Sequence, residues 1–326
     1  MNDFRFQSGV VGRGLTLRRR FLYFFRAIIE APVLLSEIPA ILGKRRTRGT
    51  ILIRFMNDLC NATLGSGLDC GNKVISFLRR RQTYIFDHRQ QQEELAASTL
   101  TAQQIDQLVE ELNTDGFVRL PQYVSAEIAK RMRDRIEISP GTDASGKNYL
   151  NISDWVMKSS SGRFDTVNSA IIEAADNEDI NFSALTLIAR RYLGASPLLL
   201  GPHSWTTTHR TGETDLQIEE NAMAYHCDSD FFGFLKVFLL LTDVSMKNGP
   251  FTFIRGSHRG KRHVQGRISN EMLKIQPNEE LFGTGQPGDV ILAATKGWHK
   301  ATPPSEGTRT MVQWLYSNGL LGSATQ

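Results

Sequence analysis

The sequence predicts a mainly β fold with flanking helices, an antiparallel sandwich or a jelly roll (double-stranded β-helix), preceded by a helical N-terminal extension. Two observations predict it. After residue 197 the apolar residues come in short runs of strand length, separated by glycine, proline and asparagine. Before residue 197 the apolar residues recur mainly at helical spacing. We therefore divide the chain into an extension, residues 1–95, and a jelly-roll domain, residues 96–326.

The composition is that of an ordinary globular protein and excludes several classes. Hydrophobic residues make up 40% of the 326 residues and charged residues 22%. These values exclude wholesale disorder, a collagen-like repeat and a polytopic membrane protein. The three cysteines, Cys60, Cys70 and Cys227, are too few and odd in number for a disulfide framework. They suit a reducing compartment, and we expect a cytoplasmic protein.

Positive charge is concentrated near the N-terminus. Residues 1–60 carry eleven Lys or Arg and four Asp or Glu, whereas acidic residues are in slight excess in the rest of the chain. Because the body of the protein is not basic, we expect no specific nucleic-acid binding. Residues 17–48 have basic ends, and aromatic and aliphatic residues recur there at helical spacing. The uncharged runs are too short to cross a membrane.

The amphipathic segment 17–48 has three interpretations. Its apolar face packs against the rest of the protein, lies on an anionic membrane surface, or contacts another partner. The first is the usual fate of an amphipathic helix. The second would give a cytoplasmic protein with a peripheral membrane contact. The oligomeric state is not apparent from the sequence.

The jelly-roll domain is predicted to begin with a helix and a short strand. Thr101 and Gln104 have the spacing of a capping box, in which each side chain satisfies a backbone amide of the other. The helix that starts there ends at Asp115-Gly116. Residues 117–120, which are apolar except for Arg119, then predict a strand, closed by Pro121.

Two more helices and a long loop are predicted before the strand-rich part. Ser125 begins a helix that runs to about Ile136, and residues 183–193 form another. Between them, residues 139–163 are rich in Gly, Ser, Asp and Asn and predict a long loop. A loop of this length is either functional, such as a lid, or disordered.

The strands of the jelly roll are predicted from the short apolar runs after residue 197. Each run is bounded by turn-forming residues. The predicted strands are residues 198–200, 204–208, 234–241, 251–254, 290–293 and 310–316.

Four residues of the strand-rich part have the chemistry of a metal and carboxylate site. His226 and Asp228 are two positions apart, so in an extended strand both side chains point to one face. In a jelly roll a late strand can return beside an early one and bring His299 to this pair. Two histidines and one carboxylate leave metal positions open and suit non-haem Fe(II) chemistry. Arg309 lies at the start of the last apolar run, and its guanidinium can donate two parallel hydrogen bonds to a carboxylate.

Ordered segments of the chain also resemble a known family. Residues 112–121 are similar to its opening helix-to-strand segment, and residues 225–228 lie where it has a His-x-Asp pair. Residues 241–259, with Asn-Gly-Pro and Gly-Ser-His, are similar to its central block, and Gly288-Asp289, His299 and Arg309 match the distal half. Between Thr101 and Tyr316 the chain thus resembles the phytanoyl-CoA dioxygenase family of Fe(II)/2-oxoglutarate-dependent oxygenases.

The resemblance implies an enzyme that uses Fe(II), 2-oxoglutarate and O2, with ascorbate as a possible reductant. It implies that His226, Asp228 and His299 hold the iron and that Arg309 binds the far carboxylate of 2-oxoglutarate. The implied reaction is hydroxylation of a small organic or lipid-like substrate, with release of succinate and CO2. Related halogenases leave the carboxylate position small so that chloride can bind iron, so Asp228 favours hydroxylation or a related oxidation over halogenation.

The chain departs from the family pattern at a position that concerns the co-substrate. Family members often carry a hydroxyl residue two positions after the distal histidine, where it helps to hold the carboxylate of 2-oxoglutarate. This chain has Ala301 there and Thr302 next. Thr302 and Lys236 are further candidates for co-substrate contacts, and His203 and His209 are candidates for lining a substrate pocket.

Two other functions remain open on the same fold. One is a cupin-like metal enzyme that does not use 2-oxoglutarate, and Arg309 distinguishes it, because only 2-oxoglutarate requires a carboxylate clamp at that place. The other is a catalytically silent binding or membrane-associated protein. The presence of all three ligand residues argues against a catalytically silent protein, because such a protein could lose a ligand residue without loss of function.

Overall fold

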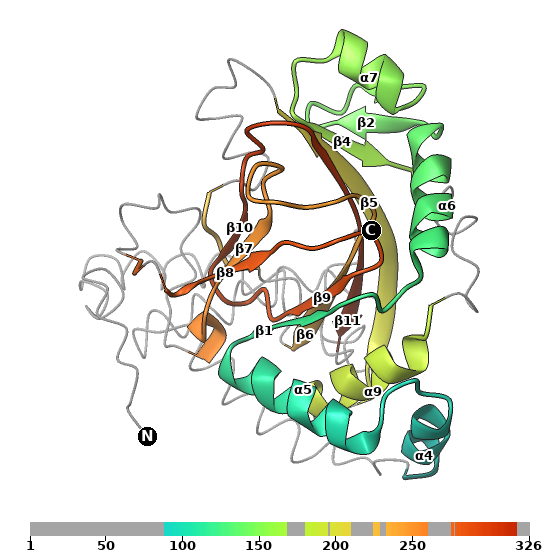
Figure 1. Ribbon diagram of the computed structural model, residues 1–326, viewed down its shortest axis with the longest axis vertical. Coiled ribbons are helices and arrows are strands. Elements are labelled where there is room, and N and C mark those ends of the chain that lie inside the picture. Colours follow the sequence, from blue (N-terminus) through green and yellow to red (C-terminus); the bar gives the residue numbers. More distant parts are fainter. Residues whose placement is uncertain are drawn as a thin grey trace, which may run out of the picture.

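The computed structural model describes most of the predicted jelly-roll domain (Figure 1). The predicted helix within residues 17–48 lies outside the described residues, and the boundary at residue 95 stays a prediction. No helix in the described part of the chain is long and apolar enough to cross a membrane. The described residues are 88–167, 180–194, 196–209, 224–228, 233–259, 275–276 and 278–317.

The helices follow local capping signals. Thr101 and Gln104 form the predicted capping box, and Ser125 accepts the first-turn amide of Ile128. Gly194 ends the helix Phe182–Leu193 in the left-handed conformation, with φ 63. The helices are α4 (His88–Ala96), α5 (Ala102–Thr114), α6 (Ala126–Glu137), α7 (Ile152–Lys158) and α9 (Phe182–Leu193).

The strands form two antiparallel sheets. The large sheet has the order β1-β9-β6-β11-β5-β4-β2-β3, and the small sheet has the order β10-β7-β8. This confirms the predicted mainly β jelly roll. The strands are β1 (Phe117–Leu120), β2 (Gly141–Asp143), β3 (Asn148–Tyr149), β4 (Arg163–Thr166), β5 (Leu198–Thr208), β6 (Phe234–Leu240), β7 (Phe251–Ile254), β8 (Glu280–Gly283), β9 (Val290–Ala293), β10 (His299–Ala301) and β11 (Thr308–Ser317).

The two faces of the large sheet carry two separate apolar cores. On β6, Val237 and Leu239 pack with residues of α5, α6 and α9, and these helices lie along the outside of the sheet (Figure 1). Phe238 and Leu240 alternate with them and pack toward β7 of the small sheet. The second face therefore lines the interior of the jelly roll, and a residue's strand position decides which face it serves.

Gly116 shows why the turn between α5 and β1 needs a glycine. Its φ is +79, and a Cβ at this position would lie 2.3 Å from Nδ1 of His258. Its carbonyl accepts the backbone N–H of Ala294. The missing side chain thus lets the turn pack against the His258 segment.

The prediction of a long loop at residues 139–163 was wrong. The segment contains β2, β3 and α7, and β4 begins at its end. These elements surround Asp143, which is 6% exposed. Its carboxylate accepts five hydrogen bonds, from the backbone N–H groups of Ser145 and Lys147 and the hydroxyls of Ser145, Tyr149 and Ser159. The polar composition that suggested a loop instead supplies this network.

The other differences between the predicted and the observed elements concern short strands. The predicted strands 198–200 and 204–208 are one strand, β5, because the chain pairs with β11 on both sides of Gly201 and Pro202, where the register shifts. The strands β8 and β10 were not predicted. They are short, and a run of only three or four residues gives little periodicity to detect.

We predict that Asp143→Ala destabilises the domain by roughly 2–4 kcal/mol, because it removes the acceptor of a buried network. Burial alone would raise the pKa of Asp143, but the hydrogen bonds outweigh it and hold the pKa at about 2. A carboxylate with a lowered pKa stabilises the fold above its unfolded pKa of about 3.9. The stabilisation is lost as the pH falls toward 2.

Urea unfolding at several pH values tests this. The difference between the wild type and Asp143→Ala should shrink between pH 5 and pH 2. Asp134→Ala is the matched control, since Asp134 pairs with Lys130 on the exposed face of α6 and should change stability much less. Equal effects of the two substitutions would contradict the role given to Asp143.

Candidate active site

A backbone bridge brings the two predicted histidine ligands together. The N–H of His226 donates to the carbonyl of His299 at 2.9 Å, and the N–H of His299 donates back at 3.0 Å. The two residues form an isolated antiparallel bridge outside the larger ladders. Paired residues of antiparallel strands project to the same side, and the two imidazole centroids are 4.3 Å apart.

Asp228 completes the group two residues further on. Its N–H donates to the carbonyl of Thr295 at 2.9 Å. Its Oδ1 lies 3.6 Å from Nε2 of His226, and its Oδ2 lies 3.3 Å from Nε2 of His299. One ligand atom from each residue lies within 4.8 Å of the others. The arrangement gives two nitrogen donors and one oxygen donor around one point.

Both imidazoles are oriented by backbone carbonyls. Nδ1 of His226 lies 2.9 Å from the carbonyl of Ala224, and Nδ1 of His299 lies 2.9 Å from the carbonyl of Gly297. Since a carbonyl only accepts, each Nδ1 carries the proton and each Nε2 keeps its lone pair for a ligand role. Burial, followed by the neighbouring His299, lowers the pKa of His226 to about 4. At neutral pH that imidazole is uncharged, the form that binds metals.

Lys236 on β6 contacts the carboxylate of this group. Its Nζ lies 2.7 Å from Oδ2 of Asp228. Burial would raise the pKa of Asp228, but Lys236 and the two imidazoles hold it well below its ordinary value. The sequence suggested that Lys236 contacts the co-substrate, and the structure brings it to Asp228. The lysine keeps a negative carboxylate in place at an otherwise buried position.

Arg309 lies at the start of β11 as a buried cation. It is 1% exposed, and its Nε and Nη1 have no hydrogen-bond partner among the described residues. Burial, together with the nearby Arg163, lowers the pKa of Arg309 to about 9. Buried guanidinium groups are normally paired, because leaving their donors unsatisfied costs free energy. The residue therefore fits a bound anion such as a carboxylate.

The structure does not bring Thr302 to this group. Its hydroxyl lies 2.7 Å from the hydroxyl of Thr252. On β7, Thr252 alternates with Phe251 and Phe253, which face the interior. Ala301 pairs with Phe251 and so takes the interior position. Thr302 thus lies on the opposite face of the small sheet.

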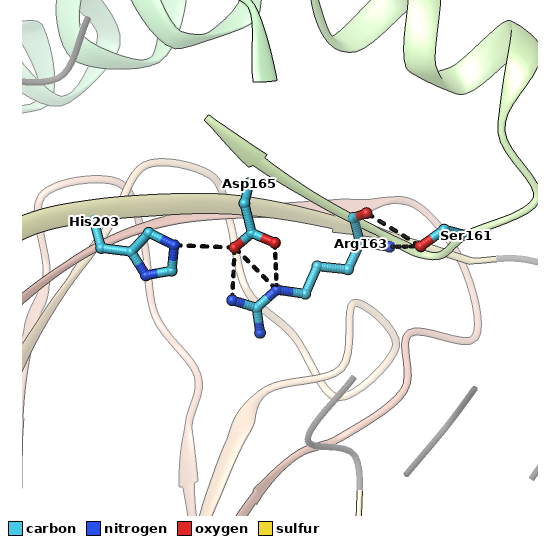
Figure 2. A network of polar contacts seen from close by, with 4 residues as sticks. All are labelled: Ser161, Arg163, Asp165 and His203. Atoms are coloured by element: carbon cyan, nitrogen blue, oxygen red, sulfur yellow. Dashed lines mark hydrogen bonds and ion pairs between the residues drawn. The ribbon is translucent and has the colours of Figure 1, made fainter. Parts of the chain in front are cut away.

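A second polar network on the interior face was not foreseen from the sequence. Arg163 donates from Nε and Nη2 to Asp165, and Nε2 of His203 lies 3.0 Å from Oδ1 of the same carboxylate (Figure 2). Burial would raise the pKa of Asp165, but His203 and Arg163 outweigh it and lower the pKa to about 2. The alternation of Arg163, Phe164, Asp165 and Thr166 was the signal that could have revealed this strand.

The two histidines proposed to line a substrate pocket lie in different settings. His203 belongs to the network of Asp165, and its ring lies 5.3 Å from that of Trp205. Nδ1 of His209 lies 3.0 Å from the carbonyl of Pro304. The structure therefore joins His203, but not His209, to the polar residues of the interior.

Tyr225, the residue before His226, links the ligand segment 225–228 to the small sheet. Tyr225 is fully buried, and its hydroxyl donates to Glu280 of β8. Nζ of Lys300 lies 4.4 Å from the centre of the Tyr225 ring. Because β8 and β10 belong to the same small sheet, these contacts fix His226 relative to His299.

The fold and this group of residues define a jelly-roll protein in which two histidines and one carboxylate fit a metal ion and a buried arginine fits an anion. The family model of phytanoyl-CoA dioxygenase (PhyH) matches residues 112–311. The chain belongs to this family, and its enzyme class uses Fe(II), 2-oxoglutarate and O2. No curated protein matches the sequence.

Solved structures with a similar fold have low sequence identity. EvdO2 from Micromonospora carbonacea var. aurantiaca, complexed with 2-oxoglutarate, is 17% identical, covers 67% of this chain and 91% of its own, and has a TM-score of 0.47. EctD from S. alaskensis with bound Fe is 18% identical, with 67% and 76% covered and a TM-score of 0.44. HygX from Streptomyces hygroscopicus, with nickel, 2-oxoglutarate and hygromycin B bound, is 17% identical, with 67% and 87% covered and a TM-score of 0.42.

We predict that Asp228→Ala weakens binding of Mn(II), a spectroscopic substitute for Fe(II), by at least about 100-fold, since it removes a charged ligand. Calorimetric titration of the metal into the apoprotein measures this directly. His209→Ala is the control, because that imidazole is held by Pro304, and it should leave the affinity unchanged. Wild-type affinity in Asp228→Ala would remove Asp228 from the site.

Proposed function

We propose that this oxygenase hydroxylates a small organic or lipid-like substrate and converts 2-oxoglutarate to succinate and CO2. The main support for this proposal is the state of Arg309, which is a buried cation with two unsatisfied hydrogen-bond donors on the interior face. A cupin-like enzyme without 2-oxoglutarate would have no need for such a clamp. Dicarboxylate binding turns the unsatisfied donors into charge-assisted hydrogen bonds.

In the proposed mechanism His226, Asp228 and His299 hold the iron. Both histidines offer Nε2, because Nδ1 of each donates to a backbone carbonyl. Lys236 balances the charge of Asp228 and fixes the carboxylate orientation. Iron bound here, together with 2-oxoglutarate, supplies the activation of O2. The chain contributes placement of the reactants.

The second contribution of the chain is an apolar environment. Phe251 lies 5.6 Å from His299, measured between ring centroids, and packs with Phe117, Phe238 and Phe253. These aromatic side chains belong to the interior core. They exclude water beside the ligand group and strengthen the electrostatic contacts made there. An apolar wall of this kind supports a lipid-like or otherwise apolar reacting carbon.

One observation favours the alternative of a silent protein. Lys236 already satisfies one oxygen of Asp228, and a lysine that keeps this carboxylate occupied would compete with a metal. The oxygenase proposal requires that Asp228 bind a metal while Lys236 is present. Lys236→Met distinguishes the two: in an oxygenase it lowers turnover, whereas in a silent protein it creates metal binding that the wild type lacks.

Succinate formation tests the proposed function. Purified full-length protein is incubated with Fe(II), ascorbate, O2 and 2-oxoglutarate, alone and with panels of small organic and lipid-like compounds. We expect succinate that is lost in His226→Ala and increased by the true substrate, whose hydroxylated product appears in equal amount. Succinate that persists in His226→Ala would contradict the proposal.

We also predict that Arg309→Gln raises the Kd for 2-oxoglutarate between about 10- and 150-fold, the range that corresponds to about 1.5–3 kcal/mol for a charge-assisted contact. Anaerobic titration of the Fe(II) protein measures it. The Kd for the metal should stay within about twofold, because Arg309 makes no hydrogen bond to a proposed metal ligand among the described residues. An unchanged Kd for 2-oxoglutarate would favour the cupin-like alternative.

A further inference from the structure

Arg163 and Arg309 face the same interior from nearby strands of the large sheet. Arg163 of β4 is paired with Thr207 of β5, and Thr207 is paired with Arg309 of β11. Directly paired residues of antiparallel strands project to the same face. With neighbouring strands about 4.8 Å apart, the two arginine Cα atoms are about 10 Å apart. Two long side chains can therefore meet one carboxylate between them.

The guanidinium of Arg163 is held in a fixed orientation. Nε and Nη2 donate to Asp165, and the group lies 5.0 Å over the ring of Trp205. In Figure 2 its third nitrogen, Nη1, points away from Asp165 and carries no dashed line. His203 in turn fixes Asp165 from the other side. The network thus presents one guanidinium nitrogen in a preset direction at low entropic cost.

The small sheet offers no hydroxyl at the position where the family often has one. Ala301 takes the interior position of β10, and the hydroxyl of Thr302 is bonded to Thr252 on the other face. A carboxylate held by Arg309 therefore lacks the usual second donor from this strand. The large sheet supplies a candidate for that donor in Arg163.

The electrostatic environment of the two arginines supports the same inference. Asp165 compensates Arg163, whereas Arg309 has no acidic partner among the described residues. Arg163 adds to the effect of burial in lowering the pKa of Arg309, so the two cations repel each other. An anion that contacts both relieves this repulsion as well as the unsatisfied donors.

We propose that Arg163 is a second anchor for the far carboxylate of 2-oxoglutarate, donating from Nη1 while Arg309 binds the same group. Asp165 and His203 are positioning residues that act through Arg163. This inference deepens the proposed function and rests on it. It replaces Thr302, the candidate suggested by the sequence, with a residue from the opposite sheet.

Anaerobic calorimetric titration of 2-oxoglutarate into the Mn(II)-loaded full-length protein tests the proposal. We expect Arg163→Gln to raise the Kd at least tenfold and Asp165→Asn to raise it by a smaller factor. Arg163→Lys keeps the charge without the fork and should fall between Arg163→Gln and the wild type. Arg119→Gln is the control, since Arg119 is an exposed arginine of β1 that bonds the carbonyl of Thr284.

A second ligand separates binding from a general distortion of the site. 2-Oxopentanoate has the length of 2-oxoglutarate but ends in a methyl group, so its Kd should be the same in the wild type and in Arg163→Gln. Equal weakening of both ligands would show distortion and overturn the proposal. An unchanged Kd for 2-oxoglutarate in Arg163→Gln would also overturn it, provided that the wild type binds.

Absence of 2-oxoglutarate binding by the wild type would instead refute the proposed function, and the role of Arg163 with it. If Arg163→Gln fails to fold, as judged by circular dichroism, Arg163→Lys and Asp165→Asn carry the test. An unchanged Kd in both would then overturn the proposal.

Discussion

The alternation of side chains across the large sheet is the constraint on which the rest of the structure depends. Most of its central strands are buried on both faces, so each position serves either the helix-facing core or the interior. β11 shows this clearly: Val312 and Trp314 pack toward the helices, and Met311 packs inward. Arg309 lies two positions before Met311 and so projects inward as well. A shift of one residue would exchange the faces and move Arg309 out of the interior.

The ligand group depends on a smaller constraint of the same kind. His226 and His299 are far apart in the sequence, and only two backbone hydrogen bonds between them set their imidazoles side by side. Tyr225 and Glu280 tie this bridge to the small sheet. The proposed iron ligands therefore lie where the two sheets meet, whereas the two arginines extend from the large sheet alone. In the proposed function, different parts of the fold thus support metal binding and carboxylate binding.

Local signals and side-chain chemistry made much of this predictable from the sequence. Thr101 and Ser125 cap helices through contacts within one turn, and the His-x-Asp pair has its geometry wherever the strand lies. The elements of residues 139–163 could not be predicted in the same way, because they depend on Asp143 and partners up to sixteen residues away. The relation of Arg163 to Arg309 depends on strand order, to which the sequence gives no direct access.

A crystal structure of the full-length protein, from crystals grown without oxygen in the presence of Fe(II) and 2-oxoglutarate, tests whether the three ligand residues and Arg309 form one oxygenase site. We expect iron bound by Nε2 of both His226 and His299 and by a carboxylate oxygen of Asp228. We also expect 2-oxoglutarate to bind this iron while its far carboxylate contacts Arg309. Iron bound elsewhere, or a far carboxylate away from Arg309, would contradict this assignment.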